Sequence, residues 1–155
     1  MQLRKSTVLL ISMVISGCGS SSNESGVVTV QAKGKILVDS KSYAGLKIQL
    51  KPKFEWKSDK IPYPHAVTDD KGEFVLETFQ PGDGAPTGDY EVSITSPTNE
   101  GLGKISDPIG SRYADSSKSG LSAKIGDAET LIPDFQLKPN TVESRVQKSA
   151  AKKNN

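Results

Sequence analysis

The sequence predicts an all-β domain, an antiparallel β-sandwich of about seven strands that spans residues 28–137. Two observations predict this fold class. Short runs rich in Val, Ile, Leu and Tyr are separated by Gly, Pro, Asp and Ser, which is the pattern of strands and turns. Between these runs there is no helical periodicity. The chain has 155 residues, 34% of them hydrophobic and 25% charged, a composition that suits one soluble domain of ordinary size.

Residues 1–17 are predicted to be a lipoprotein signal peptide. A short basic head precedes the apolar run Val8–Ile15, which is too short for a membrane span because a spanning helix needs about 20 apolar residues. The run ends in Ile15-Ser16-Gly17-Cys18, which resembles the lipobox of bacterial lipoproteins. There, small residues admit the cleavage enzyme and the cysteine thiol accepts the lipid. We therefore expect cleavage between Gly17 and Cys18 and acylation of Cys18, the only cysteine of the chain.

Residues 18–27 are predicted to be the lipidated cysteine and a flexible polar tether. Each buried methylene of an acyl chain contributes about 0.8 kcal/mol, so several chains would hold the protein on a membrane permanently. Gly19 occupies the position where an aspartate often marks retention at the inner membrane. The expected location is therefore the outer membrane of the cell envelope, with the membrane face left open. The alternative is an ordinary secretory peptide with an incidental cysteine.

The amino-terminal half of the domain is predicted to hold the first two strands. Residues 28–38 predict a strand in which Gly34 marks a bulge or a close backbone approach. After a turn at residues 40–45, residues 46–51 alternate strictly between apolar and polar side chains. This alternation places three apolar side chains on one face: Leu46, Ile48 and Leu50. Residues 54–64 contain two prolines and predict an extended loop or an edge segment.

The middle of the domain is predicted to hold a hairpin and a further strand. Residues 66–68 and 73–78 read as strands around the tight turn 69–72, where Gly72 supplies the positive φ that such turns need. A turn-rich segment then leads into a strand at residues 89–95. Three side chains of this strand are predicted to face inward: Tyr90, Val92 and Ile94.

The carboxy-terminal part is predicted to hold a long polar loop, two short strands and a tail. The loop spans residues 96–120, and its candidate anchors onto the body are Ile105, Ile109 and Tyr113. The strands are residues 121–125 and 131–137. In the second strand four side chains share a parity: Leu131, Pro133, Phe135 and Leu137. Residues 138–155 are predicted to form a basic disordered tail.

Several turn and strand motifs, in this order, resemble the carboxypeptidase regulatory-like, or transthyretin-like, β-sandwich over residues 28–137. They are the strand with Gly34, Gly45-Leu-Lys-Ile-Gln-Leu, Thr68-Asp-Asp-Lys-Gly-Glu-Phe and Pro86-Thr-Gly-Asp-Tyr-Glu-Val. More narrowly, three motifs are similar to small lipoproteins abundant in planctomycete bacteria, a family with no assigned activity. These are Thr78-Phe-Gln-Pro-Gly-Asp-Gly-Ala-Pro-Thr-Gly-Asp-Tyr, Arg112-Tyr-Ala-Asp with Ser119-Gly-Leu, and Ile132-Pro-Asp-Phe-Gln-Leu. The resemblance implies an architecture and a compartment but no reaction.

The charge distribution argues against a nucleic-acid partner. The whole chain has a formal net charge of +2, but the excess is terminal, and residues 19–137 hold thirteen basic against seventeen acidic side chains. Nucleic-acid binding needs an extended basic face with interleaved aromatic residues, so it is not expected of a body that is acidic as a whole.

Catalytic and metal chemistry are not expected from these residues, nor is a cofactor. His65 is the only histidine, so a catalytic triad or a histidine-rich metal site lacks parts, and a loop histidine is the simpler interpretation. Asp69, Asp70 and Glu73 are oxygen ligands without a calcium-loop spacing, and a turn explains them.

The leading hypothesis is a non-enzymatic, membrane-anchored sandwich with a structural or interaction role, whose partner is an envelope protein or glycan. Trp56, Tyr63 and His65 lie in a segment richer in aromatics than the family pattern, and they are the candidate binding residues for a carbohydrate or peptide. The rings of Trp56, Tyr63 and Tyr43 could form the aromatic platform for such a ligand, and packing of these rings at the edge of the sandwich is the alternative. A third hypothesis is an accessory subunit or hydrolase that uses His65.

Overall fold

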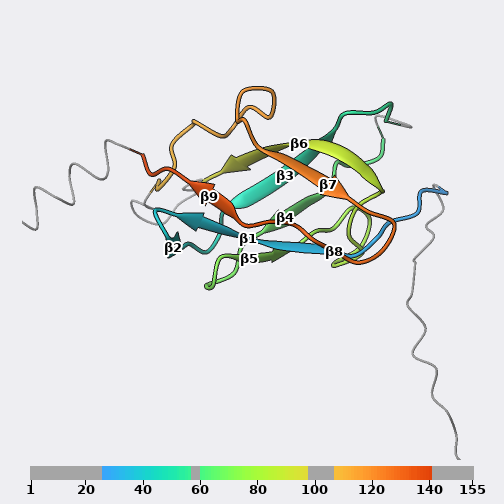
Figure 1. The fold of residues 1–155 in the computed structure, drawn as a ribbon, viewed down its shortest axis with the longest axis horizontal. Coiled ribbons are helices and arrows are strands. Elements are labelled where there is room, and N and C mark those ends of the chain that lie inside the picture. Colours follow the sequence, from blue (N-terminus) through green and yellow to red (C-terminus); the bar gives the residue numbers. More distant parts are fainter. Residues whose placement is uncertain (1–25, 57–59, 98–106, 141–155) are drawn as a thin grey trace, which may run out of the picture.

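The protein is described by a computed structural model that covers residues 26–56, 60–97 and 107–140. These residues form two β-sheets packed face to face (Figure 1), which confirms the predicted all-β sandwich. Nine strands are defined there, against about seven predicted, and the difference includes β2 and β8, each only two residues long. Nowhere in the described ranges is a helix long and apolar enough to cross a membrane.

The first sheet is built around β1 (Ala32–Val38). β2 (Lys41–Ser42) and β5 (Glu73–Val75) run antiparallel to β1, whereas β8 (Thr130–Leu131) and β9 (Phe135–Leu137) run parallel to it. The sequence predicted antiparallel pairing throughout. This sheet is mixed because the chain returns from the other sheet and lies along β1 in the same direction.

The second sheet is antiparallel and has the order β4-β3-β6-β7. Its members are β4 (His65–Val67), β3 (Lys47–Pro52), β6 (Gly88–Thr95) and β7 (Ser122–Ile125). The longest ladder joins β3 to β6, where six residue pairs face each other from Lys47↔Thr95 to Pro52↔Tyr90. Because β3 and β6 lie in the middle of the sheet, their inward side chains form the centre of the core.

The core follows the alternation that the sequence predicts. Leu46, Ile48 and Leu50 are buried, and three side chains of β6 face them across the ladder: Tyr90, Val92 and Ile94. The first sheet covers them with its own buried residues, among them Ile36, Val38, Phe74 and Phe135. Burying one such side chain contributes about 1.5–3 kcal/mol, so these alternating positions supply most of the driving force for folding.

The turn at residues 69–72 is confirmed, and the predicted hairpin is confirmed only in part: the two arms are joined by the antiparallel bridge of His65 with Glu77 and by the Asp69 N–H, which donates to the Glu73 carbonyl oxygen. Gly72 has φ +73°, and a Cβ there would lie 2.5 Å from the carbonyl oxygen of Ile36. The strands on either side belong to different sheets: β4 pairs with β3, and β5 pairs with β1. The segment therefore carries the chain from one sheet to the other, because each strand finds a longer partner than its sequence neighbour.

The last predicted strand is divided into β8 and β9. Leu131 is 73% exposed and Pro133 is exposed, whereas Ile132, Phe135 and Leu137 are buried. Leu131, Pro133, Phe135 and Leu137 were predicted to face the same side. This prediction holds for Phe135 and Leu137 and is wrong for Leu131 and Pro133. The reason is that residues 132–134 leave the ladder, which shifts the alternation between Ile132 and Phe135.

Gly34 and two of the predicted loop anchors have a clear packing role. A Cβ on Gly34 would lie 2.7 Å from Cζ of Phe74, so the glycine marks a close approach, while the β1–β5 register runs without a bulge. Ile109 and Tyr113 are buried, as predicted for anchors of the long loop. Ile105 and the tail from residue 141 onward lie outside the described residues.

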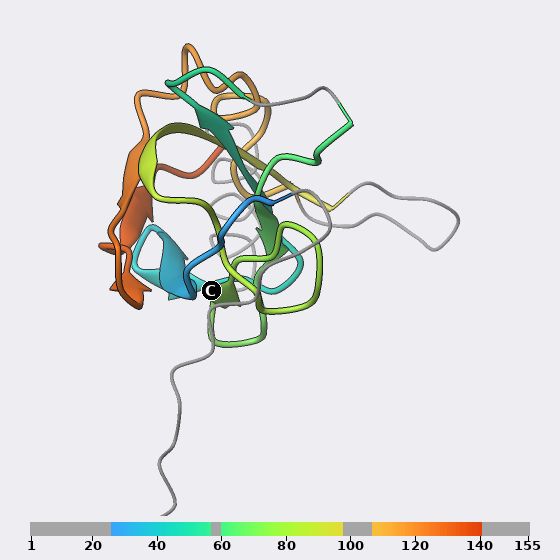
Figure 2. The ribbon, with the colours of Figure 1, turned by 90° about the vertical axis from the view of Figure 1, so that its right-hand side faces the viewer.

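The two ends of the described chain lie at opposite ends of the sandwich (Figure 1). Residues 26–30 leave at the same end as the segment that connects β3 to β4. Figure 2 views the molecule from this end, with the first described residues in front. β2 lies at the other end, together with the last described residues (Figure 1). This polarity decides which surface follows directly on the predicted tether.

Candidate functional site

Three aromatic rings gather in the segment between β3 and β4. The ring centroids of Phe54 and Trp56 are 6.0 Å apart, and those of Trp56 and Tyr63 are 5.6 Å apart with the rings edge to face. The indole Nε1–H of Trp56 donates a hydrogen bond of 3.0 Å to the carbonyl oxygen of Ile61, which closes the segment on itself. The structure thus brings together two of the three predicted binding residues, Trp56 and Tyr63.

Phe54 connects this aromatic group to the core. Its ring meets the ring of Tyr90 edge-on at 5.5 Å and lies so close to Gly88 that a Cβ there would collide with it. Tyr90 is fully buried, and its hydroxyl donates a hydrogen bond of 2.7 Å to the carbonyl oxygen of Pro86. β-Sandwiches often use such a tyrosine corner to fix the entry to a strand. Burial raises the pKa of Tyr90 far above its ordinary value.

Sequence reasoning missed Phe54 as a member of the group. The signal that could have found it is the pair of aromatic residues at positions 54 and 56, two apart and directly after the end of a strand. The partner glycine at position 88 has no such signal, because nothing in the sequence places the entry to β6 beside the end of β3.

A small apolar hollow lies beside these rings. Its volume is about 150 Å³, and it is lined by Val27, Phe54, Glu55, Trp56, Ile61 and Pro86. Pockets that enclose a small-molecule ligand usually measure about 300–1,000 Å³. The hollow is therefore too small to enclose a sugar or a cofactor, and a ligand there would have to rest on the rings from outside.

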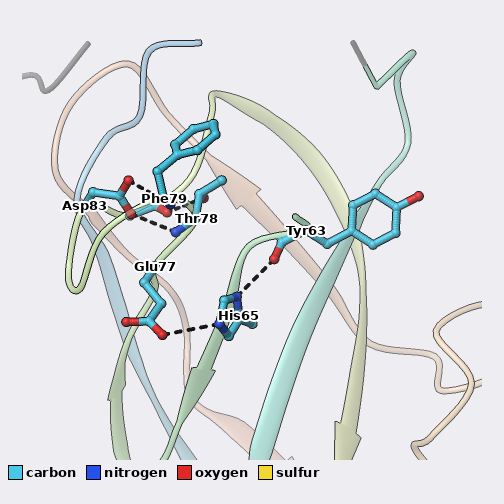
Figure 3. A network of polar contacts seen from close by, with 7 residues as sticks. Tyr63, His65, Glu77, Thr78, Phe79 and Asp83 are labelled. Atoms are coloured by element: carbon cyan, nitrogen blue, oxygen red, sulfur yellow. Dashed lines mark hydrogen bonds and ion pairs between the residues drawn. The ribbon is translucent and has the colours of Figure 1, made fainter. Parts of the chain in front are cut away.

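His65 lies on a different face from the aromatic rings. Its Nδ1 is 3.1 Å from the carbonyl oxygen of Tyr63, and its Nε2 is 3.2 Å from Oε1 of Glu77 (Figure 3). The Tyr63 ring points away from the imidazole. Both ring nitrogens thus face oxygen atoms of the protein. The structure does not bring His65 into contact with Trp56, and the ring's polar partners in the described residues include no hydroxyl nucleophile.

A second, wider hollow opens between β4 and β5, next to His65. His65 and Glu77 exchange backbone hydrogen bonds at one end of this opening, and the Asp69 N–H donates to the Glu73 carbonyl oxygen at the other. The hollow measures about 480 Å³ and is lined by Ala66, Val67, Asp69, Glu73, Phe74, Val75, Glu77 and Gly82.

Val67 and Val75 face this opening from opposite sides, and both are more than half exposed. The Thr68 N–H donates to the Leu46 carbonyl oxygen, so by alternation the backbone groups of Val67 point away from β3. The same argument applies to Val75, because the Leu76 N–H donates to the Ala32 carbonyl oxygen. Both edges are therefore left unpaired at this one position. Sequence reasoning missed the opening because it assigned the two strands to one hairpin.

Of the acidic side chains considered for calcium, Asp69 acts as a turn cap, and Oε1 of Glu73 lies 3.7 Å from Nζ of Lys35. Oδ1 of Asp69 accepts hydrogen bonds from the N–H groups of Lys71 and Glu73, at 2.9 and 2.8 Å. The Asp83 carboxylate likewise accepts from the N–H groups of Thr78 and Phe79 (Figure 3). Within the described residues, no group of three or more His, Cys, Asp or Glu side chains is gathered as a metal site would need.

Gly17 and Cys18, the predicted cleavage and lipidation residues, lie outside the described residues. Comparison of the chain with known protein families and with curated proteins found no match.

Proposed function

We propose that this chain is the precursor of a lipid-anchored cell-envelope protein, cleaved before Cys18 and acylated on that residue. The observation that carries the proposal is the lipobox-like Ile15-Ser16-Gly17-Cys18, which ends a short apolar run and contains the only cysteine of the chain. The thiol is the atom that can accept the lipid, and no second cysteine competes for a disulfide.

The proposed role of the domain is structural or interactive, without catalysis. The sandwich is proposed to be of the carboxypeptidase regulatory-like kind, on the motifs around Gly34, Gly72, Gly88 and Tyr90. Those residues serve backbone shape and packing, which is what a binding or spacer domain requires. His65 has a carboxylate and a carbonyl as neighbours, which supports a structural place for it. The proposed membrane is the outer one of a two-membrane cell, and the proposed partners are an envelope protein or glycan.

The anchor is tested by metabolic labelling. The full precursor and its Cys18→Ala variant are expressed in a bacterial host with an alkyne palmitate, and each product is followed by mass and by membrane fractionation. We expect lipid on the wild-type chain and its loss in Cys18→Ala. Ser20→Ala, two residues away, is the matched control and should label like wild type. An unlabelled wild-type chain in the soluble fraction, cut at another position, would overturn the proposal and indicate a secreted sandwich.

A carbohydrate- or peptide-binding module is the second candidate, favoured by the contact between the rings of Trp56 and Tyr63. Such rings can stack on the apolar face of a sugar or on a proline-rich peptide. The test compares wild type with Trp56→Ala on a glycan array and in peptide pull-downs, with Tyr43→Ala as an aromatic control away from the loop. Signals that are unchanged by Trp56→Ala would exclude this candidate.

A further inference from the structure

One end of the sandwich carries an apolar surface rimmed by aromatic side chains. We call it the aromatic end surface; its apolar residues are Val27, Phe54, Trp56, Ile61 and Pro86, which line the small hollow together with Glu55. Phe54 is 39% exposed although its ring also packs on the core, and Trp56 and Ile61 are partly exposed. This surface therefore leaves large apolar side chains in contact with solvent at the end where the described chain begins (Figure 2).

The segment that forms this surface is basic in an otherwise acidic body. Residues 51–63 contain four lysines and two carboxylates, a net charge of +2, whereas the rest of residues 19–137 holds nine basic and fifteen acidic side chains. Lys51 and Lys53 are exposed, and within the described residues neither forms an ion pair with a carboxylate. Lys51 lies opposite Glu91 in the β3–β6 ladder, and Lys53 directly precedes Phe54, so two exposed cationic side chains lead into the aromatic segment.

The start of the described chain places this surface close to the proposed anchor. Val27 lines the hollow, and eight residue steps separate Gly26 from Cys18. A chain of this length spans at most roughly 28 Å, and as a flexible coil its mean span is about 16 Å. The diameter of a domain of this size is about 35 Å. This length is shorter than the domain, so acylation of Cys18 would keep this end of the sandwich towards the bilayer.

We infer that the aromatic end surface docks on the headgroup region of an anionic lipid bilayer, with Trp56 at the interface and Lys51 and Lys53 facing the phosphates. The inference rests on the proposed function, because the tether positions the surface only if Cys18 is acylated. Tryptophan is enriched at membrane–water interfaces, and lysines near an anionic leaflet are attracted to it. Tethering raises the effective concentration of lipid at this surface, so weak contacts suffice to orient the domain.

A bilayer fits this surface better than an enclosed ligand does. The hollow of about 150 Å³ is small for a ligand pocket, whereas a bilayer needs only an exposed apolar rim with cationic neighbours. The opposite end of the sandwich, at β2, would then face away from the membrane and be presented to partners (Figure 1).

The test uses Trp56 as the reporter, since it is the only tryptophan in the chain. The mature acylated protein is reconstituted into vesicles of phosphatidylcholine with phosphatidylglycerol, with or without bromine atoms on the phosphatidylcholine acyl chains. Co-sedimentation measures the anchor, and quenching of Trp56 emission by the brominated lipid measures docking of the surface. We expect co-sedimentation, a shift of the emission to shorter wavelength, and loss of emission in brominated vesicles.

Charge-reversal variants separate docking from mere proximity. Lys51→Glu with Lys53→Glu should co-sediment like wild type but lose most of the quenching. The matched control is Lys41→Glu with Lys71→Glu, which makes the same change of charge at exposed positions on the opposite end, beside β2. This control should be quenched like wild type. Equal quenching of both double variants would overturn the role of the two lysines.

The remaining outcomes distinguish the inference from the proposed function. Co-sedimentation without quenching would overturn docking while the anchor stands, and a Trp56 emission change on adding soluble glycan would then favour the sugar-binding candidate. A protein that stays in the supernatant, without lipid, would overturn the anchor itself and with it the tether argument.

Discussion

At the residue scale, Tyr90 and Phe54 connect the start of β6 to the segment that follows β3. The Tyr90 hydroxyl fixes the corner before β6 through the Pro86 carbonyl, and the Phe54 ring covers Tyr90 from the end of β3. Gly88 allows the close approach of the Phe54 ring. The same contact that completes the core also holds the Phe54–Trp56 segment in place, so the proposed membrane surface is coupled to the fold.

Tyr90→Phe is expected to lower the free energy of unfolding by about 1–3 kcal/mol, because it leaves the buried Pro86 carbonyl without its donor. The substitution should also change how the free energy of unfolding depends on pH above about pH 10. Burial raises the folded-state pKa of Tyr90 above its ordinary value, so stability is fully present below about pH 10 and is lost as pH rises further. Urea unfolding at about pH 7 and pH 10.5 measures both effects.

The matched control for this prediction is Tyr43→Phe. The Tyr43 ring also packs against the core, but its side chain lacks a buried hydroxyl bond like that of Tyr90 in the described structure. We expect Tyr43→Phe to unfold like wild type at both pH values. An equal loss in the two variants would contradict the role assigned to the Tyr90–Pro86 hydrogen bond.

At the element scale, the segment from β4 through the 69–72 turn to β5 joins the two sheets. β4 and β5 are joined by backbone hydrogen bonds on either side of Val67 and Val75, but not at these two residues. The edges of both sheets are therefore open at this one position. The turn is fixed by Asp69, whose carboxylate accepts two backbone N–H groups, and by the positive φ of Gly72. The edge opening is protected from further strand pairing because it is closed at both ends.

Gly72→Ala is expected to destabilise the protein by more than Gly120→Ala. Both glycines have a positive φ, which carries a penalty of roughly 1–2 kcal/mol for an L side chain. A Cβ at position 120 meets nothing within 4 Å, whereas one at position 72 lies 2.5 Å from the Ile36 carbonyl oxygen. Thermal unfolding of the two variants isolates this steric term, and equal melting temperatures would mean that the turn adjusts freely.

Hydrogen exchange of backbone amides is expected to locate the opening. The amides of His65 and Glu77 donate to each other's carbonyls and should exchange slowly, because they open only with the surrounding structure. The amides of Val67 and Val75 point into the opening and should exchange much faster. Residue-resolved exchange by NMR measures this. Slow exchange at Val67 and Val75 would show that the two strands pair continuously in solution.

At the scale of the whole molecule, the fold has a polarity from one end to the other. The described chain begins beside the aromatic end surface, and it ends at the opposite end, near β2 (Figure 1). The Lys138 N–H donates to the Tyr113 hydroxyl and the Asn140 N–H to the Pro108 carbonyl, so the last described residues are held to the long loop. If the proposed anchor holds the first end, this polarity would present the end at β2 away from the membrane.

Two surface carboxyls are expected to shape the acid limb of stability. A hydrogen bond from Ser117, and then Lys118, lowers the pKa of Asp115, and Lys33 at 2.6 Å lowers that of Glu129. Depressed folded-state pKa values contribute stability that is present above about pH 4–4.5 and is lost as pH falls through them. The double variant Asp115→Asn with Glu129→Gln should therefore lose less melting temperature than wild type between about pH 5 and pH 3.

The matched control for the acid limb is Asp127→Asn with Asp134→Asn, which removes two other exposed carboxyls. This control should follow the wild-type curve. A wild-type melting temperature that is flat down to about pH 3 would contradict the contribution assigned to the two hydrogen-bonded carboxyls.

The sequence by itself determined the class of fold and most of its inward-facing residues. Strict alternation at residues 46–51 and 89–95 predicts which side chains are buried, because the side-chain period of a strand is fixed by its backbone. The same holds for the turn at Gly72, whose positive φ is a local property. The proposal of a lipid anchor also depends on the sequence alone, since it follows from Cys18 and the run before it.

Only the tertiary structure decided which strands pair and which side chains meet. The partners of β4 and β5, the parallel course of β8 and β9, and the contact of Phe54 with Gly88 depend on residues far apart in the chain. It also placed the His65 imidazole away from the rings of Trp56 and Tyr63, although the Tyr63 carbonyl contacts it and all three residues lie within ten positions. The physical reason is that the local sequence determines the alternation of side chains and the turns. Which strands pair depends instead on which strand edges offer each other the most hydrogen bonds and bury the most apolar surface.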